Sequence, residues 1–425
     1  MNRRYEIIDK CIEYGIYVYV FFMFLAKGEG IKNIIIFGGF LLWSFTLKQR
    51  KTLSLLKSPV SIFCWSYVGA TVLSAIFSID PLFSLKELKG EILKFALLYP
   101  VIATVMTDEE RLRKTALVSF ITLLLIVGTG YYSYLFHDIE MMKPDTALVH
   151  AWHTKFARYL CTLMPLSFVL FFVWNKRWQK GIIVISLLLS LMALVLSTAR
   201  GGYIAFASIA LLWLIYLSRT KRYDLRRIAG GAVIIAGLAG IAAIVFFPHS
   251  LDRLSNTREE IFTLNKRTAL WEQAYYAFVQ RPLTGWGYGD RIFLQDEPYR
   301  NTPYGEAPQK EKGTHNMFMK VLFHQGIIGL LSYVLVVASA TVLFWKSSVR
   351  SGGFRSYYLV ACASVLLGNY IVNSLLEDVV RLQYLAVVLG LGMAALGMEN
   401  RSIAGAPSFC KEIQHPSRNT EKLGN

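Results

Sequence analysis

The chain has 425 residues, of which 54% are hydrophobic and only 17% are charged, and its mean hydropathy is +0.43. Soluble domains carry about 25% charged residues, so this composition excludes a disordered chain and disfavours an ordinary soluble enzyme. The long apolar runs that recur along the chain instead predict an integral membrane protein.

The predicted elements are helices, because unpaired backbone polar groups are not tolerated in lipid. A run of about 20 apolar residues crosses a bilayer as a helix. We predict about twelve such spans, at residues 12–26, 31–47, 59–79, 92–106, 115–136, 156–174, 181–197, 203–218, 228–247, 316–345, 357–376 and 382–398. The fold class is therefore an all-α polytopic membrane protein, with spans one to nine in residues 1–247 and spans ten to twelve in residues 315–398.

The net charge of +17 has two readings, a nucleic-acid partner or the orientation of membrane spans. Lys and Arg collect in the short cytoplasmic loops of membrane proteins. With the N-terminus inside, the inside segments hold 25 Lys and Arg, and the five short outside segments hold 10. This contrast predicts that both termini are cytoplasmic, and it explains the charge without nucleic acid.

Residues 248–314 form the one long segment on the predicted outer face. This segment of 67 residues contains nine basic and nine acidic side chains, so it is not a general basic patch. Loops of this length are usually functional. Residues 399–425 are polar and are predicted to form a disordered cytoplasmic tail.

Within the long segment, residues 267–280 are predicted to form an amphipathic helix, because Arg267 and apolar residues recur on one face at spacings of three and four. Asn265 or Thr263 is predicted to cap the helix start, and Pro282 to end the helix. Arg267 then either binds a ligand or covers apolar surface with its stem.

Three side chains at the predicted outer rim are candidates for chemistry. Arg200 lies in a very short outer turn, and charges at the rim of a membrane protein are functional candidates. Guanidinium groups bind phosphate oxygens bidentately, so Arg200 and Arg267 together suit a diphosphate. His315 lies where the long loop re-enters the bilayer. A lone histidine is more often structural, but its unperturbed pKa of about 6.5 also suits a general base.

Weaker candidates lie in two other outer loops. Lys86 and Lys89 add positive charge or form a solvated face, and Glu377-Asp378 offers acidic groups or an interfacial ion pair. No metal site is predicted, because His150 and His153 lack a third ligand. No cofactor motif was found, and a P-loop is absent.

Several short motifs together resemble the O-antigen ligase and polymerase superfamily. They are, in chain order, Arg200-Gly201-Gly202, Arg267-x3-Trp271-x2-Ala274-x7-Pro282-x2-Gly285-x-Gly287-x-Gly289, His315-Asn316 and Gly326-x2-Gly329. The predicted topology of about twelve spans, with one large, partly helical periplasmic loop between spans nine and ten, is similar as well. The size of the chain and the single large loop resemble the ligase branch.

The resemblance implies a metal-independent, inverting membrane glycosyltransferase of the GT-C-like type, without a cofactor. Such an enzyme moves O-antigen polysaccharide from undecaprenyl diphosphate to a sugar hydroxyl of lipid A–core, on the periplasmic face of the Gram-negative inner membrane. The resemblance assigns the donor diphosphate to Arg200 and Arg267. It assigns His315 as the general base or as a group that positions the acceptor. It adds a lysine, Lys86 or Lys89, and an acidic residue, Asp378.

Three alternatives remain open at this point. An O-antigen polymerase shares the donor but commonly has two sizeable periplasmic loops, and another relative attaches glycans to protein hydroxyls. A polysaccharide-lipid transporter would place charges in the middle of its spans and break helices at symmetric positions. The candidate charges lie at the outer rim instead, which favours an enzyme.

Overall fold

The computed structural model describes residues 3–137, 142–220, 257–308, 313–377 and 381–404. These residues form helices without a β-strand. The elements are α1 (Arg3–Phe22), α2 (Glu29–Phe45), η1 (Leu47–Gln49), η2 (Lys51–Lys57), α3 (Pro59–Ile76), α4 (Pro81–Glu87), α5 (Ile92–Val105), α6 (Glu109–Phe136), α7 (His153–Val173), α8 (Arg177–Leu196), α9 (Arg200–Arg219), α12 (Thr257–Gln280), α13 (Asp290–Phe293), η3 (Glu297–Tyr299), α14 (Met317–Arg350), α15 (Gly353–Val365), η4 (Leu366–Val372), η5 (Asn373–Leu375) and α16 (Leu382–Ala404).

Seven helices of the described residues are long and apolar enough to cross a membrane, which agrees with the prediction of a helical membrane protein. They are α3, α6, α7, α8, α9, α14 and the continuous helix formed by α15, η4 and η5. The apolar part of α16, Leu382–Met398, is shorter. Three more predicted spans form α1, α2 and α5, which do not reach the same length and hydropathy, and the predicted span 228–247 lies outside the described residues. Twelve crossings therefore stay a prediction.

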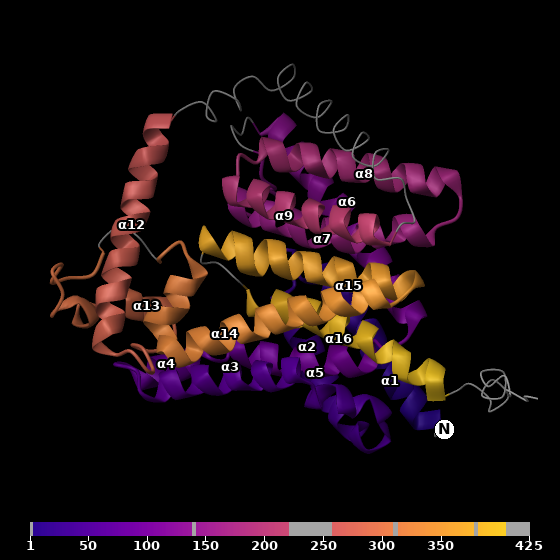
Figure 1. Cartoon of the computed structure of the whole chain (residues 1–425), viewed down its shortest axis with the longest axis horizontal. Helices are drawn as coiled ribbons and strands as arrows, with labels where there is room; N and C mark the ends of the chain where they lie inside the picture. The colour runs from indigo at the N-terminus through magenta and orange to yellow at the C-terminus, as the bar shows by residue number, and fades with distance from the viewer. Residues whose placement is uncertain (1–2, 138–141, 221–256, 309–312, 378–380, 405–425) are drawn as a thin grey trace, which may run out of the picture.

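The helices run mostly along the long axis of the molecule (Figure 1). Helices α6 to α9 form one side, α14 and α15 lie in the middle, and α1, α2, α3, α5 and α16 form the other side. Helix α14 packs on α3 and α15, and α16 packs on α5. Helix α12 lies across the end of the bundle at which α14 begins.

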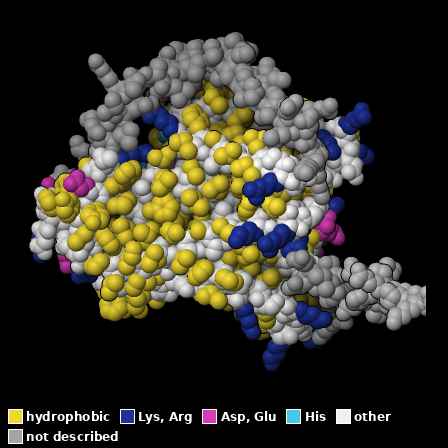
Figure 2. All heavy atoms as spheres, in the orientation of Figure 1, with side chains coloured by type: hydrophobic (Ala, Val, Ile, Leu, Met, Phe, Trp, Pro, Cys, Tyr) yellow, Lys and Arg dark blue, Asp and Glu magenta, His cyan; other side chains and the backbone are white. Residues whose placement is uncertain are grey.

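Hydrophobic side chains cover much of the visible face of the bundle (Figure 2). Large apolar side chains that point away from the core include Ile34 and Phe45 of α2 and Phe136 of α6, which are 73%, 72% and 72% exposed. An apolar surface of this extent is typical of a membrane interface. The described bundle therefore has the surface expected of a protein in lipid.

Segments that were predicted to share one side of the membrane lie together in the structure. At one end, Asp9 near the start of α1 contacts Arg50 between η1 and η2, and Arg111 in α6. At the opposite end, the backbone N–H of Ala26 donates to the carbonyl of Leu148. These contacts agree with the predicted grouping of the segments that they join, and the topology of the whole chain and the compartment that each end faces stay predictions.

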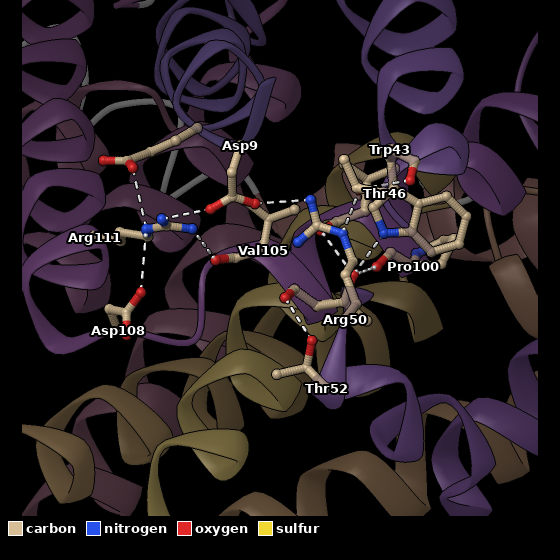
Figure 3. A network of polar contacts seen from close by, with 12 residues as sticks. Asp9, Trp43, Thr46, Arg50, Thr52, Pro100, Val105, Asp108 and Arg111 are labelled. Carbon is tan, nitrogen blue, oxygen red and sulfur yellow. Dashed lines mark hydrogen bonds and ion pairs between the residues drawn. The ribbon is translucent and has the colours of Figure 1, made fainter. Parts of the chain in front are cut away.

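The charged network at the first end joins three segments (Figure 3). The two oxygens of Asp9 accept hydrogen bonds from Arg50 Nη2 at 2.8 Å and from Arg111 Nη2 at 2.6 Å. Arg111 Nε also lies 3.1 Å from Glu13 and 3.2 Å from Asp108. The side chain of Arg50 is only 2% exposed, so its buried positive charge needs Asp9 as a counter-charge.

Asp9→Asn is expected to lower the free energy of unfolding by about 3 kcal/mol or more, because it leaves two partly buried guanidinium groups short of a counter-charge. The matched control is Glu109→Gln, which breaks the exposed ion pair with Arg113 and is expected to cost less than about 1 kcal/mol. Unfolding of both variants in detergent micelles measures the difference. Equal effects would contradict a stabilising role for the network.

One predicted helix start was wrong. Helix α12 begins at Thr257, ten residues before the predicted start at 267, so neither Thr263 nor Asn265 is its cap. No glycine or proline lies between Thr257 and Gln280 to interrupt the helix. Its end at Gln280 agrees with the predicted stop at Pro282. The apolar part of α16, Leu382–Met398, has the bounds of the last predicted span, and the helix itself continues to Ala404.

Candidate functional site

Arg200 is the first residue of α9 and is exposed at the end of the bundle where α12 lies. The glycine that follows it brings the start of α9 against η5. A Cβ atom on Gly201 would lie 2.5 Å from Oδ1 of Asn373 and 3.6 Å from Cβ of Leu376. Glycine here allows the start of α9 to approach η5 closely, and this approach brings the backbone next to Arg200 beside residues 373–376.

Arg267 reaches the same segment from α12. Its Nη1 donates a hydrogen bond to the carbonyl oxygen of Leu376 at 3.0 Å, and its Nη2 lies 3.8 Å from Oε1 of Glu377. The side chain is 26% exposed. The guanidinium group of Arg267 is thus directed at a polar segment between two apolar helices and does not simply cover apolar surface with its stem.

His315 is held between two residues that are fixed to neighbouring elements. On one side, Trp271 of α12 donates from Nε1 to the carbonyl of Thr314 at 2.8 Å. On the other side, Asn316 donates from Nδ2 to the carbonyl of Leu375 at 3.1 Å, while its Oδ1 caps the first turn of α14. His315 is half-buried between these anchors. Its position relative to residues 373–377 is therefore set from both sides.

Residues 373–377 contact Arg267 directly, and they contact the chain neighbours of Arg200 and His315. They follow the π-helical turn η4, and π-helical turns occur frequently at functional sites. Within the described residues, only Thr198 and His315 combine a side chain with positive φ, at 52° and 49°. Strained backbone of this kind clusters at functional sites. Both residues belong to this site, since Thr198 lies two positions before Arg200.

The glycine motifs join the segment after α12 to α14. Helix α14 is broken at Gly326, where φ is 64°. The N–H of Ile327 donates instead to the carbonyl of Pro282 at 2.8 Å. A Cβ atom on Gly326 would collide with the carbonyl of Leu283, and one on Gly285 would lie 2.5 Å from that of His324. The two glycines therefore let the backbone of the loop lie directly on the backbone of α14.

Gly326→Ala is expected to destabilise the protein strongly, because it adds a backbone collision to an unfavourable φ. The matched control is Gly305→Ala, where φ is 72° but no atom lies within 4 Å of the new Cβ. The control is expected to lose about 1–2 kcal/mol, and Gly326→Ala roughly 1–3 kcal/mol more. Comparison of their unfolding midpoints in detergent measures the cost of the collision, and identical midpoints would contradict it.

The structure does not join the remaining candidates to this site. Lys86 lies in α4 and Lys89 follows it, and both are exposed. The hydrogen bonds and ion pairs of the described residues do not connect either lysine to Arg200, Arg267 or His315. Asp378 lies outside the described residues. Among the described residues, no group of three or more His, Cys, Asp and Glu side chains is placed to hold a metal ion.

Asp290 and Lys320 join the segment after α12 to the first turn of α14 near the site. Asp290 Oδ1 lies 2.6 Å from Lys320 Nζ. Burial is the largest single influence and acts to raise the pKa of Asp290, but the charge of Lys320, its hydrogen bond to the carboxylate and the charge of His324 together outweigh burial and hold this pKa below its usual value. The aspartate stays ionised, so the ion pair helps to keep the loop in place over α14.

The sequence did not identify residues 373–377, the segment on which the candidates converge. Asn373 lies within the predicted span 357–376, and its Oδ1 is buried without a hydrogen-bond partner in the described part of the chain. Asn369, one turn earlier, also has a buried Oδ1 without such a partner. Two amide side chains inside an apolar run were the available signal, since polar groups within a span mark functional sites.

Comparison with known proteins gives one family. Residues 185–334 match the family model described as O-Antigen ligase. The matched region runs from α8 into α14 and includes Arg200, Arg267 and His315. A comparison with curated proteins found no match.

Proposed function

We propose that this chain, a member of the O-antigen ligase superfamily by its match over residues 185–334, transfers O-antigen polysaccharide from undecaprenyl diphosphate to a sugar hydroxyl of lipid A–core. The proposed location is the Gram-negative inner membrane, with both termini in the cytoplasm. Residues 1–247 and 315–398 would then form the membrane part, residues 248–314 the periplasmic loop and residues 399–425 a cytoplasmic tail.

The observation that carries the proposal is the convergence of Arg200, Arg267 and His315. They come from three elements that are far apart in the sequence, and each has a direct contact, or a sequence neighbour with a contact, to residues 373–377. Two guanidinium groups and one imidazole at the end of a membrane bundle suit the charged headgroup of a lipid-linked substrate. The lipid tails of both substrates would lie beside the bundle.

The chemistry requires stabilisation of a leaving diphosphate. As the bond from the anomeric carbon to the diphosphate oxygen breaks, undecaprenyl diphosphate leaves with the electron pair. Arg200 and Arg267 stabilise this negative charge in a site of low dielectric. They supply the positive charge that a divalent cation supplies in other transferases, so the proposed reaction needs no metal.

The second half of the reaction activates the acceptor. The acceptor hydroxyl attacks the anomeric carbon from the side opposite the diphosphate, so that the configuration inverts. His315 takes the hydroxyl proton as general base, a role worth about 10²–10⁴-fold in rate. Lys86 or Lys89 and Asp378 are proposed to assist in substrate binding.

Deletion of the gene, followed by analysis of the lipopolysaccharide and the lipid-linked glycan, tests the proposed function. We expect loss of the whole O-antigen ladder while the lipid-linked polymer accumulates. A ladder reduced to one repeat would favour an O-antigen polymerase, and an intact ladder with loss of glycans from proteins would favour a protein glycosyltransferase. An intact ladder and unchanged protein glycans would contradict all three.

A further inference from the structure

Arg158 is a buried cation that the proposed mechanism does not use. It lies in the second turn of α7 and is only 6% exposed. Its Nε atom is buried without a hydrogen-bond partner, and none of the hydrogen bonds and ion pairs of the described residues involves its guanidinium group. A buried charge is costly unless it is paired. This arginine is therefore placed to bind an anion.

Other charged side chains lie at the same end of the bundle as Arg158. Lys155, half-buried one turn earlier, experiences the charges of Arg158 and Arg381. Arg381 Nη1 lies 3.8 Å from Glu91 Oε1, and Glu29 is shared by Lys32 and Lys94 at 2.7 and 3.7 Å. Five cations thus face two carboxylates, namely Lys32, Lys94, Lys155, Arg158 and Arg381 against Glu29 and Glu91.

The carboxylates offset only part of this charge. Burial raises the pKa of Glu91, although Arg381 acts against it. Its Oε2 is buried without a hydrogen-bond partner in the described part of the chain. Glu29 is already paired with two lysines, and the pair between Arg381 and Glu91 is long. The excess positive charge therefore falls on Lys155, Arg158 and Arg381.

This cluster lies close to the candidate active site. The carbonyl of Arg158 accepts a hydrogen bond from Nδ2 of Asn369 at 3.2 Å. Asn373 follows Asn369 by four residues, roughly 6 Å along a helix, and contacts Gly201 next to Arg200. The buried oxygens of both asparagines are without hydrogen-bond partners among the described residues. The backbone of α7 at Arg158 is thus linked through Asn369 and Asn373 to the start of α9, where Arg200 lies.

We propose that Lys155, Arg158 and Arg381 form a second anion-binding subsite, which takes a phosphate group of the acceptor lipid. The inference rests on the proposed function, in which Arg200 and Arg267 already hold the donor diphosphate. A guanidinium group suits phosphate because its planar donors match two phosphate oxygens. Anchoring the acceptor through its phosphate fixes the sugar hydroxyl that must reach His315.

Binding measurements on the full-length protein in detergent micelles test the subsite. The probes are phosphorylated lipid A–core and the same lipid after enzymatic removal of its phosphates. We expect loss of the phosphates to weaken binding to the unmodified protein about tenfold or more, as for loss of a charged hydrogen bond. Arg158→Gln should weaken binding of the phosphorylated lipid by the same factor as removal of the phosphates does. The variant should therefore bind the two lipids with equal affinity.

Controls separate the subsite from general charge effects and from misfolding. Arg113→Gln, an exposed arginine at the opposite end of the bundle, is expected to bind both lipids as the unmodified protein does. Lys155 is half-buried. We expect Lys155→Gln, like Arg158→Gln, to reduce the difference in affinity between the two lipids. If Arg158→Gln does not fold, undiminished discrimination by Lys155→Gln overturns the proposal.

Parallel binding of undecaprenyl diphosphate and inorganic phosphate identifies the source of the anion. Weaker binding of undecaprenyl diphosphate to Arg158→Gln, with unchanged binding of the acceptor, would assign the cluster to the donor and overturn the proposal. So would inorganic phosphate binding that depends on Arg158 while the two lipids bind equally well. Phosphate-dependent binding of the acceptor without any glycan transfer would support the subsite and contradict the proposed function.

Discussion

Arg267→Ala is expected to lower glycan transfer by at least about 100-fold, because removing one fixed donor from a site of developing negative charge costs about 10²–10³-fold. The side chain is held by the carbonyl of Leu376 and lies near Glu377, so its guanidinium group is positioned before substrate binds. The measurements are the amount of capped lipopolysaccharide in cells and the transfer rate of the purified protein.

Two further variants separate the chemistry of Arg267 from its charge and its surroundings. Arg267→Lys keeps the positive charge but loses the planar donor pair, and is expected to retain an intermediate rate. Arg300→Ala removes an exposed arginine from the same outer segment and is expected to transfer normally. A normal ladder with Arg267→Ala, at unchanged abundance of the protein, would remove Arg267 from the proposed mechanism.

Helix positions in the described bundle were predictable from hydropathy. The apolar run at 156–174 became α7 at His153–Val173, and the run at 181–197 became α8 at Arg177–Leu196. The physical reason is that lipid allows only one local solution, since every backbone polar group must bond within its own segment. The rule needs no knowledge of neighbouring helices, so local sequence suffices.

The breaks within these helices were not predictable in the same way. The run at 316–345 was read as one span, but α14 is broken at Gly326 because the N–H of Ile327 bonds to Pro282 in the outer loop. A glycine inside an apolar run is compatible with either a continuous or a broken helix. The choice depends on a partner 45 residues earlier in the chain, which no local pattern contains.

The candidate site shows the same division. Arg200 and Arg267 were selected because charged side chains at the rim of a membrane protein are functional candidates. The structure brings the start of α9 and the side chain of Arg267 to one segment. That segment, residues 373–377, was hidden inside a predicted span. Arg158 also lay inside a predicted span, at 156–174, where a charge alone is a signal of function. The positions of charges were thus informative, whereas their mutual contacts required the fold.

His315 offers a way to separate catalysis from folding. Its φ of 49° lies in the left-handed region, which glycine and asparagine adopt more readily than other residues. We therefore expect His315→Gly and His315→Asn to fold as well as the unmodified protein. Both lack a general base, so transfer should fall about 10²–10⁴-fold. The measurements are the unfolding midpoint in detergent and the transfer rate.

His315→Ala completes the comparison, because alanine lacks the imidazole but keeps the strain of positive φ. It is expected to be less stable than His315→Gly by about 1 kcal/mol, with an equally low transfer rate. If His315 served only to shape the turn between Thr314 and Asn316, transfer would instead follow stability, and the glycine and asparagine variants would remain active. Added imidazole that restores transfer in His315→Gly would assign the missing function to proton transfer, since a free base in the vacated space provides no backbone restraint.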